Sequence, residues 1–223
     1  MAGEIETSLI VDDAHFEYLK IQKGNLEPFA SDRRQWHELY ERDLLRTFTE
    51  IRPHLPKLCW AFLDIGSGLG GIDVLIGRHY EQTGGCRPYT HLLDGVDDPP
   101  VMRLHRETFS NMRVARDFQI KNGLPPERFG YFGTREQFFR RPYDLVVSFG
   151  SWCFHYPPST YLRELTKGGG LHADTVIVVD MRRGKQWASE FSAVGFQEIA
   201  TVRSSAKLER VVWRRSADVP AAA

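Results

Sequence analysis

The sequence lacks the features that would place it in several large classes of protein. Its three cysteines, Cys59, Cys86 and Cys153, are too few and too irregularly spaced for a disulfide framework or a zinc site. No apolar run approaches the roughly 20 residues that a membrane-spanning helix requires. Residues 1–11 lack the basic segment followed by an apolar segment that marks a signal peptide. We therefore expect a cytoplasmic protein with no membrane partner and no bound metal.

An excess of charge of one sign is also missing. The 223 residues include 29 Lys and Arg and 29 Asp and Glu, which gives a net charge of zero. This balance argues against an overall electrostatic attraction to nucleic acid. Four local exceptions are the arginine pairs Arg33-Arg34, Arg140-Arg141, Arg182-Arg183 and Arg214-Arg215. Because 42% of the residues are hydrophobic, the chain has enough apolar surface for one folded domain with a short addition.

The apolar pattern predicts an α/β protein. Apolar runs that suit strands alternate with segments of helical spacing, and glycine or proline separates most of them. No helical pattern lies between residues 196–202 and 208–213, which predicts an antiparallel pair at the end. The expected strands are residues 58–65, 89–94, 128–132, 143–149, 175–180, 196–202 and 208–213.

The first part of the chain is predicted to be an N-terminal helical cap, residues 1–56. A helix is expected near Ala14–Gln22, and a second follows Asp32, which forms a capping-box pattern with Gln35. Residues 57–215 are expected to form the core, and residues 216–223 a disordered tail.

The most informative segment is the glycine-rich turn after the first strand. Gly66, Ser67 and Gly68 follow an apolar strand and precede a helix, whose N-terminal amide groups favour negative charge. Asp94 lies at the end of the next strand, where an acid accepts hydrogen bonds from ribose hydroxyls. The segment therefore predicts binding of a nucleoside-containing cofactor. The alternative is that the glycines only form a tight turn from strand to helix.

Asp64, two residues before the first glycine, indicates which cofactor. Its carboxylate would repel a pyrophosphate and attract an ammonium group. S-adenosylmethionine (SAM) carries an amino group and a sulfonium and has no phosphate, so Asp64 favours SAM over NAD. A phosphate-binding P-loop is excluded, because no Gly-Lys-Ser/Thr follows the glycines.

The motifs together resemble those of class I SAM-dependent methyltransferases. Residues 64–70 (DIGSGLG) are similar to the first motif of that family, residues 143–148 (YDLVVS) to its fourth-strand motif, and residues 165–170 (LTKGGG) to its turn before strand five. The resemblance implies a doubly wound seven-stranded sheet of order 3-2-1-4-5-7-6, with strand 7 antiparallel. It also implies that Gly133 and Thr134 lie near the adenine, and that Ser148, Phe149 and Gly150 contact the cofactor.

The segment after the fourth strand is where methyl transfer would occur. His155 is the candidate general base, because its ordinary pKa near 6.5 suits proton removal at neutral pH. Trp152, Phe154 and Tyr156 are candidates for contacts with the acceptor. The alternatives are that His155 only shapes the loop and that the aromatic rings pack in the core. Asp180, after the fifth strand, is a further candidate for orienting an acceptor.

These observations predict a SAM-dependent methyltransferase that methylates a small-molecule hydroxyl, such as one on a sugar or a secondary metabolite, without a metal. Methylation of RNA or protein through the arginine pairs is a second interpretation. An NAD-dependent reductase is a third, and a methyltransferase-like protein that binds a nucleoside or partner without catalysis is a fourth.

Overall fold

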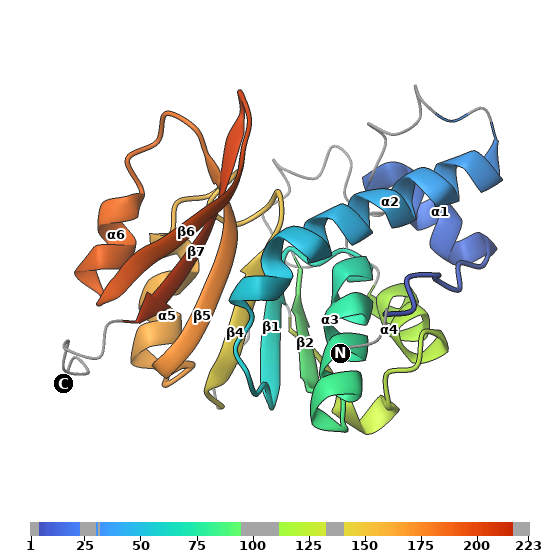
Figure 1. Ribbon diagram of the computed structural model, residues 1–223, viewed down its shortest axis with the longest axis horizontal. Helices are drawn as coiled ribbons and strands as arrows, with labels where there is room; N and C mark the ends of the chain where they lie inside the picture. Colours follow the sequence, from blue (N-terminus) through green and yellow to red (C-terminus); the bar gives the residue numbers. More distant parts are fainter. Residues whose placement is uncertain (1–4, 23–29, 31, 95–111, 133–140, 216–223) are drawn as a thin grey trace. The chain divides into compact units, whose positions relative to one another are not determined.

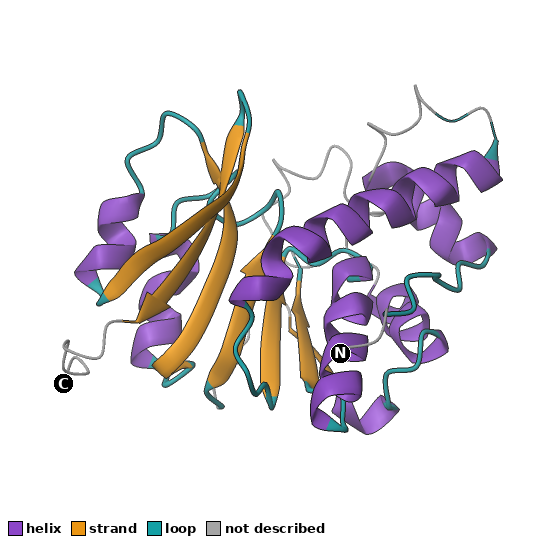
Figure 2. Cartoon of the chain, in the orientation of Figure 1, coloured by secondary structure: helices purple, strands orange, loops and turns teal. Residues whose placement is uncertain are grey.

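The computed structural model describes residues 5–22, 30, 32–94, 112–132 and 141–215, in which helices alternate with strands (Figure 1). The helices are α1 (Asp13–Gln22), α2 (Arg33–Ile51), α3 (Gly71–Gly84), α4 (Met112–Lys121), α5 (Ser159–Lys167) and α6 (Ala188–Ala193). The strands are β1 (Ala61–Ile65), β2 (Tyr89–Leu93), β3 (Phe129–Phe132), β4 (Tyr143–Ser148), β5 (Leu171–Arg182), β6 (Phe196–Ser204) and β7 (Leu208–Arg215). Short 3-10 helices at Arg52–His54 and Pro126–Arg128 complete the described elements (Figure 2).

The strands form a seven-stranded sheet of order β3-β2-β1-β4-β5-β7-β6. β4 pairs in parallel with β1 and with β5, and β2 pairs in parallel with β3. β7 pairs antiparallel with both β5 and β6. The predicted fold class, strand order and antiparallel final strand are therefore confirmed. Among the described residues, no helix has both the length and the apolar character needed to cross a bilayer.

The chain divides into two compact units. The first unit is Met1–Thr49 with Ser67–Arg135, and the second is Glu50–Gly66 with Glu136–Ala223. The predicted division into residues 1–56, 57–215 and 216–223 stays a prediction, and the tail it includes lies outside the described residues.

In the first unit, α2 buries an apolar stripe at helical spacing that comprises Trp36, Tyr40, Leu44 and Phe48. The helix begins where the sequence predicts, because the Gln35 amide donates to Asp32 Oδ1 at 2.9 Å. Tyr40 packs so closely on the start of α3 that a Cβ at position 71 would lie 2.0 Å from its Oη. Only glycine leaves room for this contact.

In the second unit, β4 and β5 are buried as apolar runs. β5 is longer than the predicted 175–180, since its first residue, Leu171, already pairs with Tyr143. The segment 172–174 contains the polar residues His172 and Asp174, which break the apolar pattern just before Thr175. Their groups are hydrogen-bonded all the same: Thr175 Oγ1 donates to the Tyr143 carbonyl at 2.8 Å, and the His172 ring contacts Asp144 at 3.1 Å. Tertiary contacts thus extend a strand that the sequence pattern ends.

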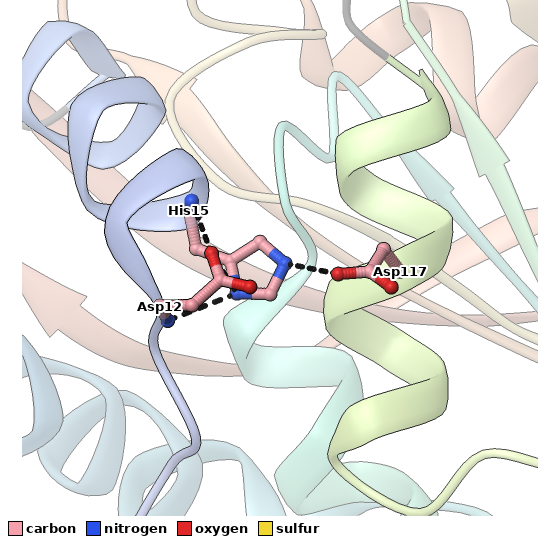
Figure 3. Close-up of side chains that lie close together, drawn as sticks. All are labelled: Asp12, His15 and Asp117. Carbon is pink, nitrogen blue, oxygen red and sulfur yellow. Dashed lines mark hydrogen bonds and ion pairs between the residues drawn. The ribbon is translucent and has the colours of Figure 1, made fainter.

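A charged cluster joins α1 to α4 in the first unit (Figure 3). The His15 amide donates to Asp12 Oδ1 at 2.9 Å, and the Asp12 amide in turn donates to His15 Nδ1 at 3.2 Å. Because Nδ1 accepts a hydrogen bond, the ring proton lies on Nε2, which donates to Asp117 Oδ2 at 3.0 Å. Lys121 Nζ lies 2.6 Å from Asp12 and 2.7 Å from Asp117. The side chain of His15 is fully buried, and this burial lowers its pKa below 6.5.

We expect His15 to make the protein less stable as the pH falls. A histidine whose pKa is lowered by folding is held neutral in the native state, so its contribution is complete above about pH 6.5 and is lost below that value. The urea midpoint of the native protein should therefore drop more between about pH 7.5 and pH 5.5 than that of His15→Gln. His54→Gln is the matched control and should keep the native pH dependence. Equal drops for the native protein and His15→Gln would contradict the prediction.

Candidate functional site

The glycine-rich turn begins at the carboxyl end of β1, in the second unit. Asp64 is the penultimate residue of β1 and is 3% exposed. Gly66 follows with a φ of 74°, in the left-handed region that favours glycine. A Cβ at this position would lie 2.0 Å from Ser151 Oγ. A larger residue would therefore clash with the Ser151 side chain, which is a second reason for glycine here. The segment that the sequence singles out is thus a tight turn with a buried acid at its start.

The turn continues in the first unit, where it meets the predicted ribose-binding acid. The Gly68 amide donates to Asp94 Oδ2 at 3.0 Å, and the Ser67 amide lies 3.5 Å from the Leu93 carbonyl oxygen. Asp94 follows β2 directly. The structure therefore brings Gly68 and Asp94 together, although 26 residues separate them.

Gln119 forms hydrogen bonds with this turn, although no motif in the sequence points to it. It lies on α4, is 1% exposed, and its Nε2 donates to the carbonyl oxygens of Leu69 and Gly70 at 2.8 Å and 2.7 Å. Gly70 has a φ of 71°, and a Cβ there would meet the Gln119 amide at 2.6 Å. The one sequence feature that could have indicated this role is the position of Gln119, a polar residue next to Phe118 on the apolar face of a predicted helix.

The end of β4, in the second unit, holds the predicted cofactor contacts Ser148, Phe149 and Gly150. Ser148 is fully buried; its Oγ donates to the Ile65 carbonyl at 2.6 Å and accepts the Trp152 amide at 2.9 Å. It therefore joins the end of β1 to the loop after β4. Its contact with a cofactor stays a prediction, as do those of Phe149 and Gly150. Gly133 and Thr134, predicted to lie near the adenine, are outside the described residues.

The loop after β4 closes into a tight turn that presents His155. The Cys153 amide donates to the Tyr156 carbonyl at 2.9 Å, and the His155 amide donates to the Ser151 carbonyl at 2.8 Å. Cys153 has a φ of 65°, and it is the one described non-glycine residue with a positive φ. Such a conformation costs on the order of 1–3 kcal/mol and persists only where the surroundings enforce it. The hydrogen bonds of this turn therefore hold Cys153 in a conformation that a non-glycine residue rarely adopts.

His155 itself is exposed. Its ring lies 4.9 Å from the ring of Phe154 and 6.3 Å from that of Tyr156, measured between centroids. Partial burial of the ring lowers the pKa of His155 below 6.5, and the positive charge of Arg182 lowers it further. The side chain is therefore neutral at pH 7 and able to accept a proton. Its role as general base stays a prediction.

The three aromatic residues predicted to contact the acceptor differ in exposure. Trp152 is fully buried, packs against Phe191, and donates its Nε1–H to the Pro158 carbonyl at 3.1 Å. This is the packing of a core residue. Phe154 and Tyr156 are partly exposed on the turn. The predicted acceptor contacts stay predictions, and the geometry favours Phe154 and Tyr156 over Trp152.

Asp180, considered for orienting an acceptor, is instead one half of a buried ion pair. Arg210 donates to both of its carboxylate oxygens, at 2.8 Å from Nε and 3.1 Å from Nη2. Arg210 Nη1 also donates to Glu50 at 2.9 Å, and Glu50 pairs with Arg203 at 3.2 Å. The Arg210 guanidinium lies 4.5 Å from the centroid of the Phe149 ring. The network thus holds the first residue after β4 by a cation–π contact.

Metal-ligating side chains lie close together at one place among the described residues. These are Asp12, His15 and Asp117, whose ligand atoms lie within 4.8 Å of one another. The ammonium group of Lys121 contacts both carboxylates and offsets one of their two negative charges. The prediction of a metal-free reaction stays a prediction.

Comparison with known proteins supports the fold. No family model and no curated protein sequence matches this chain. Residues 961–1257 of StiE, described as O-MT, align at 12% identity over 97% of this chain and 87% of that chain, with a TM-score of 0.60. The PH0226 protein of Pyrococcus horikoshii OT3 aligns at 15% identity over 78% and 91% of the two chains, with a TM-score of 0.52. The yhhF protein of Escherichia coli, provisionally described as a methyltransferase, aligns at 12% identity over 80% of this chain and 86% of that chain, with a TM-score of 0.51. At these identities the comparisons show that this chain shares the fold of these proteins, and they show the fold alone.

We expect Arg210 to be essential for stability. Arg210→Met leaves Asp180 buried without its bidentate partner, a change that typically costs about 3–5 kcal/mol. The free energy of unfolding, measured by urea titration, should fall by about this amount, whereas the exposed Arg183→Met should change it by less than about 0.5 kcal/mol. A loss below about 1 kcal/mol for Arg210→Met would show that the pair is not needed.

Proposed function

We propose that this protein is a SAM-dependent methyltransferase that methylates a hydroxyl group of a small-molecule acceptor. The observation that carries the proposal is a glycine turn that starts at the buried Asp64, contains no basic residue and pairs its Gly68 amide with Asp94. Asp94 suits the ribose hydroxyls of an adenosine cofactor. The carboxylate of Asp64 suits the ammonium group of SAM and would repel a pyrophosphate. The residues present therefore fit SAM better than a dinucleotide.

The roles of the binding residues follow from their chemistry. Asp64 would accept hydrogen bonds from the ammonium group, and Asp94 from the ribose hydroxyls, because a carboxylate has about four lone-pair sites and Gly68 uses one of those on Asp94. The glycines let a ligand approach the backbone closely. When bound, SAM supplies a methyl group on a sulfonium, which is an excellent leaving group.

His155 would remove the proton from the acceptor hydroxyl. It stands on a turn held by backbone hydrogen bonds, and its lowered pKa keeps it neutral at pH 7. A rigid position matters because methyl transfer depends on alignment of the reacting atoms. Phe154 and Tyr156, on the same turn, would contact the body of the acceptor.

A small molecule is favoured over RNA because several of the paired arginines have acid partners. Arg33 pairs with Asp13, and Arg183 pairs with Glu209 at 3.2 Å. Arginines committed in this way contribute less to a phosphate-binding surface.

Calorimetry with SAM and its demethylated product tests the cofactor. Asp94→Ala should weaken both ligands by about 1–3 kcal/mol, the scale of lost charge-assisted hydrogen bonds. Asp94→Asn keeps an acceptor for the Gly68 amide and removes the charge, so it separates binding from local folding. The exposed Asp174→Ala serves as control and should bind normally. Native affinity in both Asp94 variants, or tighter binding of NADH than of SAM, would refute the proposal.

The role of His155 is tested with a hydroxyl acceptor found by screening. His155→Ala should lower turnover by about 10²–10⁴ and leave SAM affinity unchanged. Since the base acts when neutral, kcat/KM should rise with pH through an apparent pKa below 6.5, and this rise should disappear in the variant. Near-native turnover of His155→Ala would remove it from the mechanism.

A further inference from the structure

Two basic side chains lie at the end of β5 and in the turn after it, in the second unit, and neither has an acid partner among the described residues. Arg182 is the last residue of β5, and Lys185 lies in the turn that follows; both are exposed. That turn is closed by the Lys185 amide, which lies 3.3 Å from the Arg182 carbonyl oxygen. Neither side chain forms an ion pair with any residue in the described part of the chain.

Two acids close in sequence or in the sheet, Glu209 and Asp180, pair with other arginines. Glu209 pairs with Arg183, whose Nη1 also donates to the Ser205 carbonyl at 3.1 Å. Both carboxylate oxygens of Asp180 accept hydrogen bonds from one edge of the Arg210 guanidinium, formed by Nε and Nη2. Within the described part of the chain, no ion pair therefore compensates the positive charge of Arg182 and Lys185 at the carboxyl end of β5.

Each of the two cations lies over an aromatic ring. The Arg182 guanidinium is 5.8 Å from the centroid of Phe154, and Lys185 Nζ is 6.0 Å from that of Trp187. A guanidinium that lies over a ring keeps its N–H groups free to donate. Two of them can donate to a carboxylate or phosphate in a bidentate geometry. The aromatic surfaces would contact the apolar part of the same ligand.

The backbone fixes this arrangement next to His155. The Arg182 amide donates to the Cys153 carbonyl at 2.8 Å, so the turn after β5 is tied to the strained turn after β4. Phe154, on which Arg182 lies, is the residue immediately before His155. The positive charge of Arg182 also acts on the His155 ring, since it lowers the pKa of that group. The cation of Arg182, the ring of Phe154 and the candidate base His155 thus lie beside one another.

We propose that Arg182, assisted by Lys185, binds an anionic group of the acceptor, a carboxylate or a phosphate. The acceptor class is then a small molecule that carries both a hydroxyl and an anionic group, with the hydroxyl directed to His155. The assignment of the hydroxyl rests on the proposed function, whereas the anion site can be tested without SAM.

The test is equilibrium binding to the full chain, with and without the demethylated product of SAM. The probes are para-hydroxybenzoate, para-hydroxyphenyl phosphate and the neutral para-hydroxybenzamide, and NMR of the His155 ring signals reports where they bind. At least one of the two anions should bind about tenfold or more tightly than the amide, as expected for a charge-assisted hydrogen bond. The tighter of the two anions identifies the group as carboxylate or phosphate.

Variants decide whether Arg182 carries the preference. Arg182→Met keeps the backbone amide that bonds to Cys153 and should abolish most of the preference for the anions, and Lys185→Met should reduce it. Arg183→Met, the matched control with its own acid partner, should retain it. Equal binding of anions and amide, or a preference that survives in Arg182→Met or is lost equally in Arg183→Met, would overturn the inference. Tighter, salt-sensitive binding of a single-stranded RNA through the same residues would overturn it in favour of a nucleic-acid acceptor.

The two proposals fail separately. If calorimetry detects no SAM binding while the anion preference persists, the methyltransferase proposal fails and the anion site stands. If SAM binds and the anions show no preference, the anion site fails alone.

Discussion

The hydrogen bond from the Gly68 amide to the Asp94 carboxylate is the constraint on which the site depends. In a dinucleotide-binding turn, amides at this position are available to a pyrophosphate. Here the protein's own acid accepts one of them and brings a negative charge to the turn. An acid at this position suits a ligand that offers hydroxyl donors. Gln119 stabilises the turn from the other side, through the carbonyl oxygens of Leu69 and Gly70.

The second unit contains two kinds of charged side chain: buried ones that pair with each other, and the exposed cations of Arg182 and Lys185. Asp180, Arg210 and Glu50 lie in one network, in which the most deeply buried groups satisfy each other. Burial of an unpaired charge would be costly, so such pairing is what a stable interior requires. Arg182 and Lys185 lie outside this network and are exposed. The distinction is physical: only a charge that is not already neutralised can contribute strongly to recognition of an ion.

Rigidity at the end of β4 comes from backbone contacts. Ser148 connects the ends of β1 and the following loop, and Cys153 adopts a left-handed conformation that its neighbours enforce. The Arg182 amide fastens the same turn to the end of β5. These contacts fix the backbone that carries His155. The proposed methyl transfer would require such alignment of the reacting groups.

The sequence by itself determined the α/β class, the glycine turn and the start of α2 at Asp32, because these follow from local signals: apolar runs, glycines and a capping residue. The strand order was implied by the resemblance to class I methyltransferases. Asp94 was predicted from the sequence as a ribose-binding acid, and the structure adds its hydrogen bond with the Gly68 amide. Only the tertiary structure decided that Trp152 is a core residue, that Gln119 supports the turn and that Asp180 belongs to Arg210. Arg210 and Glu50 are 160 residues apart, and no local pattern encodes such a contact. The role of a polar side chain depends on which partner the fold brings to it, and that partner is set by packing rather than by neighbours in the chain.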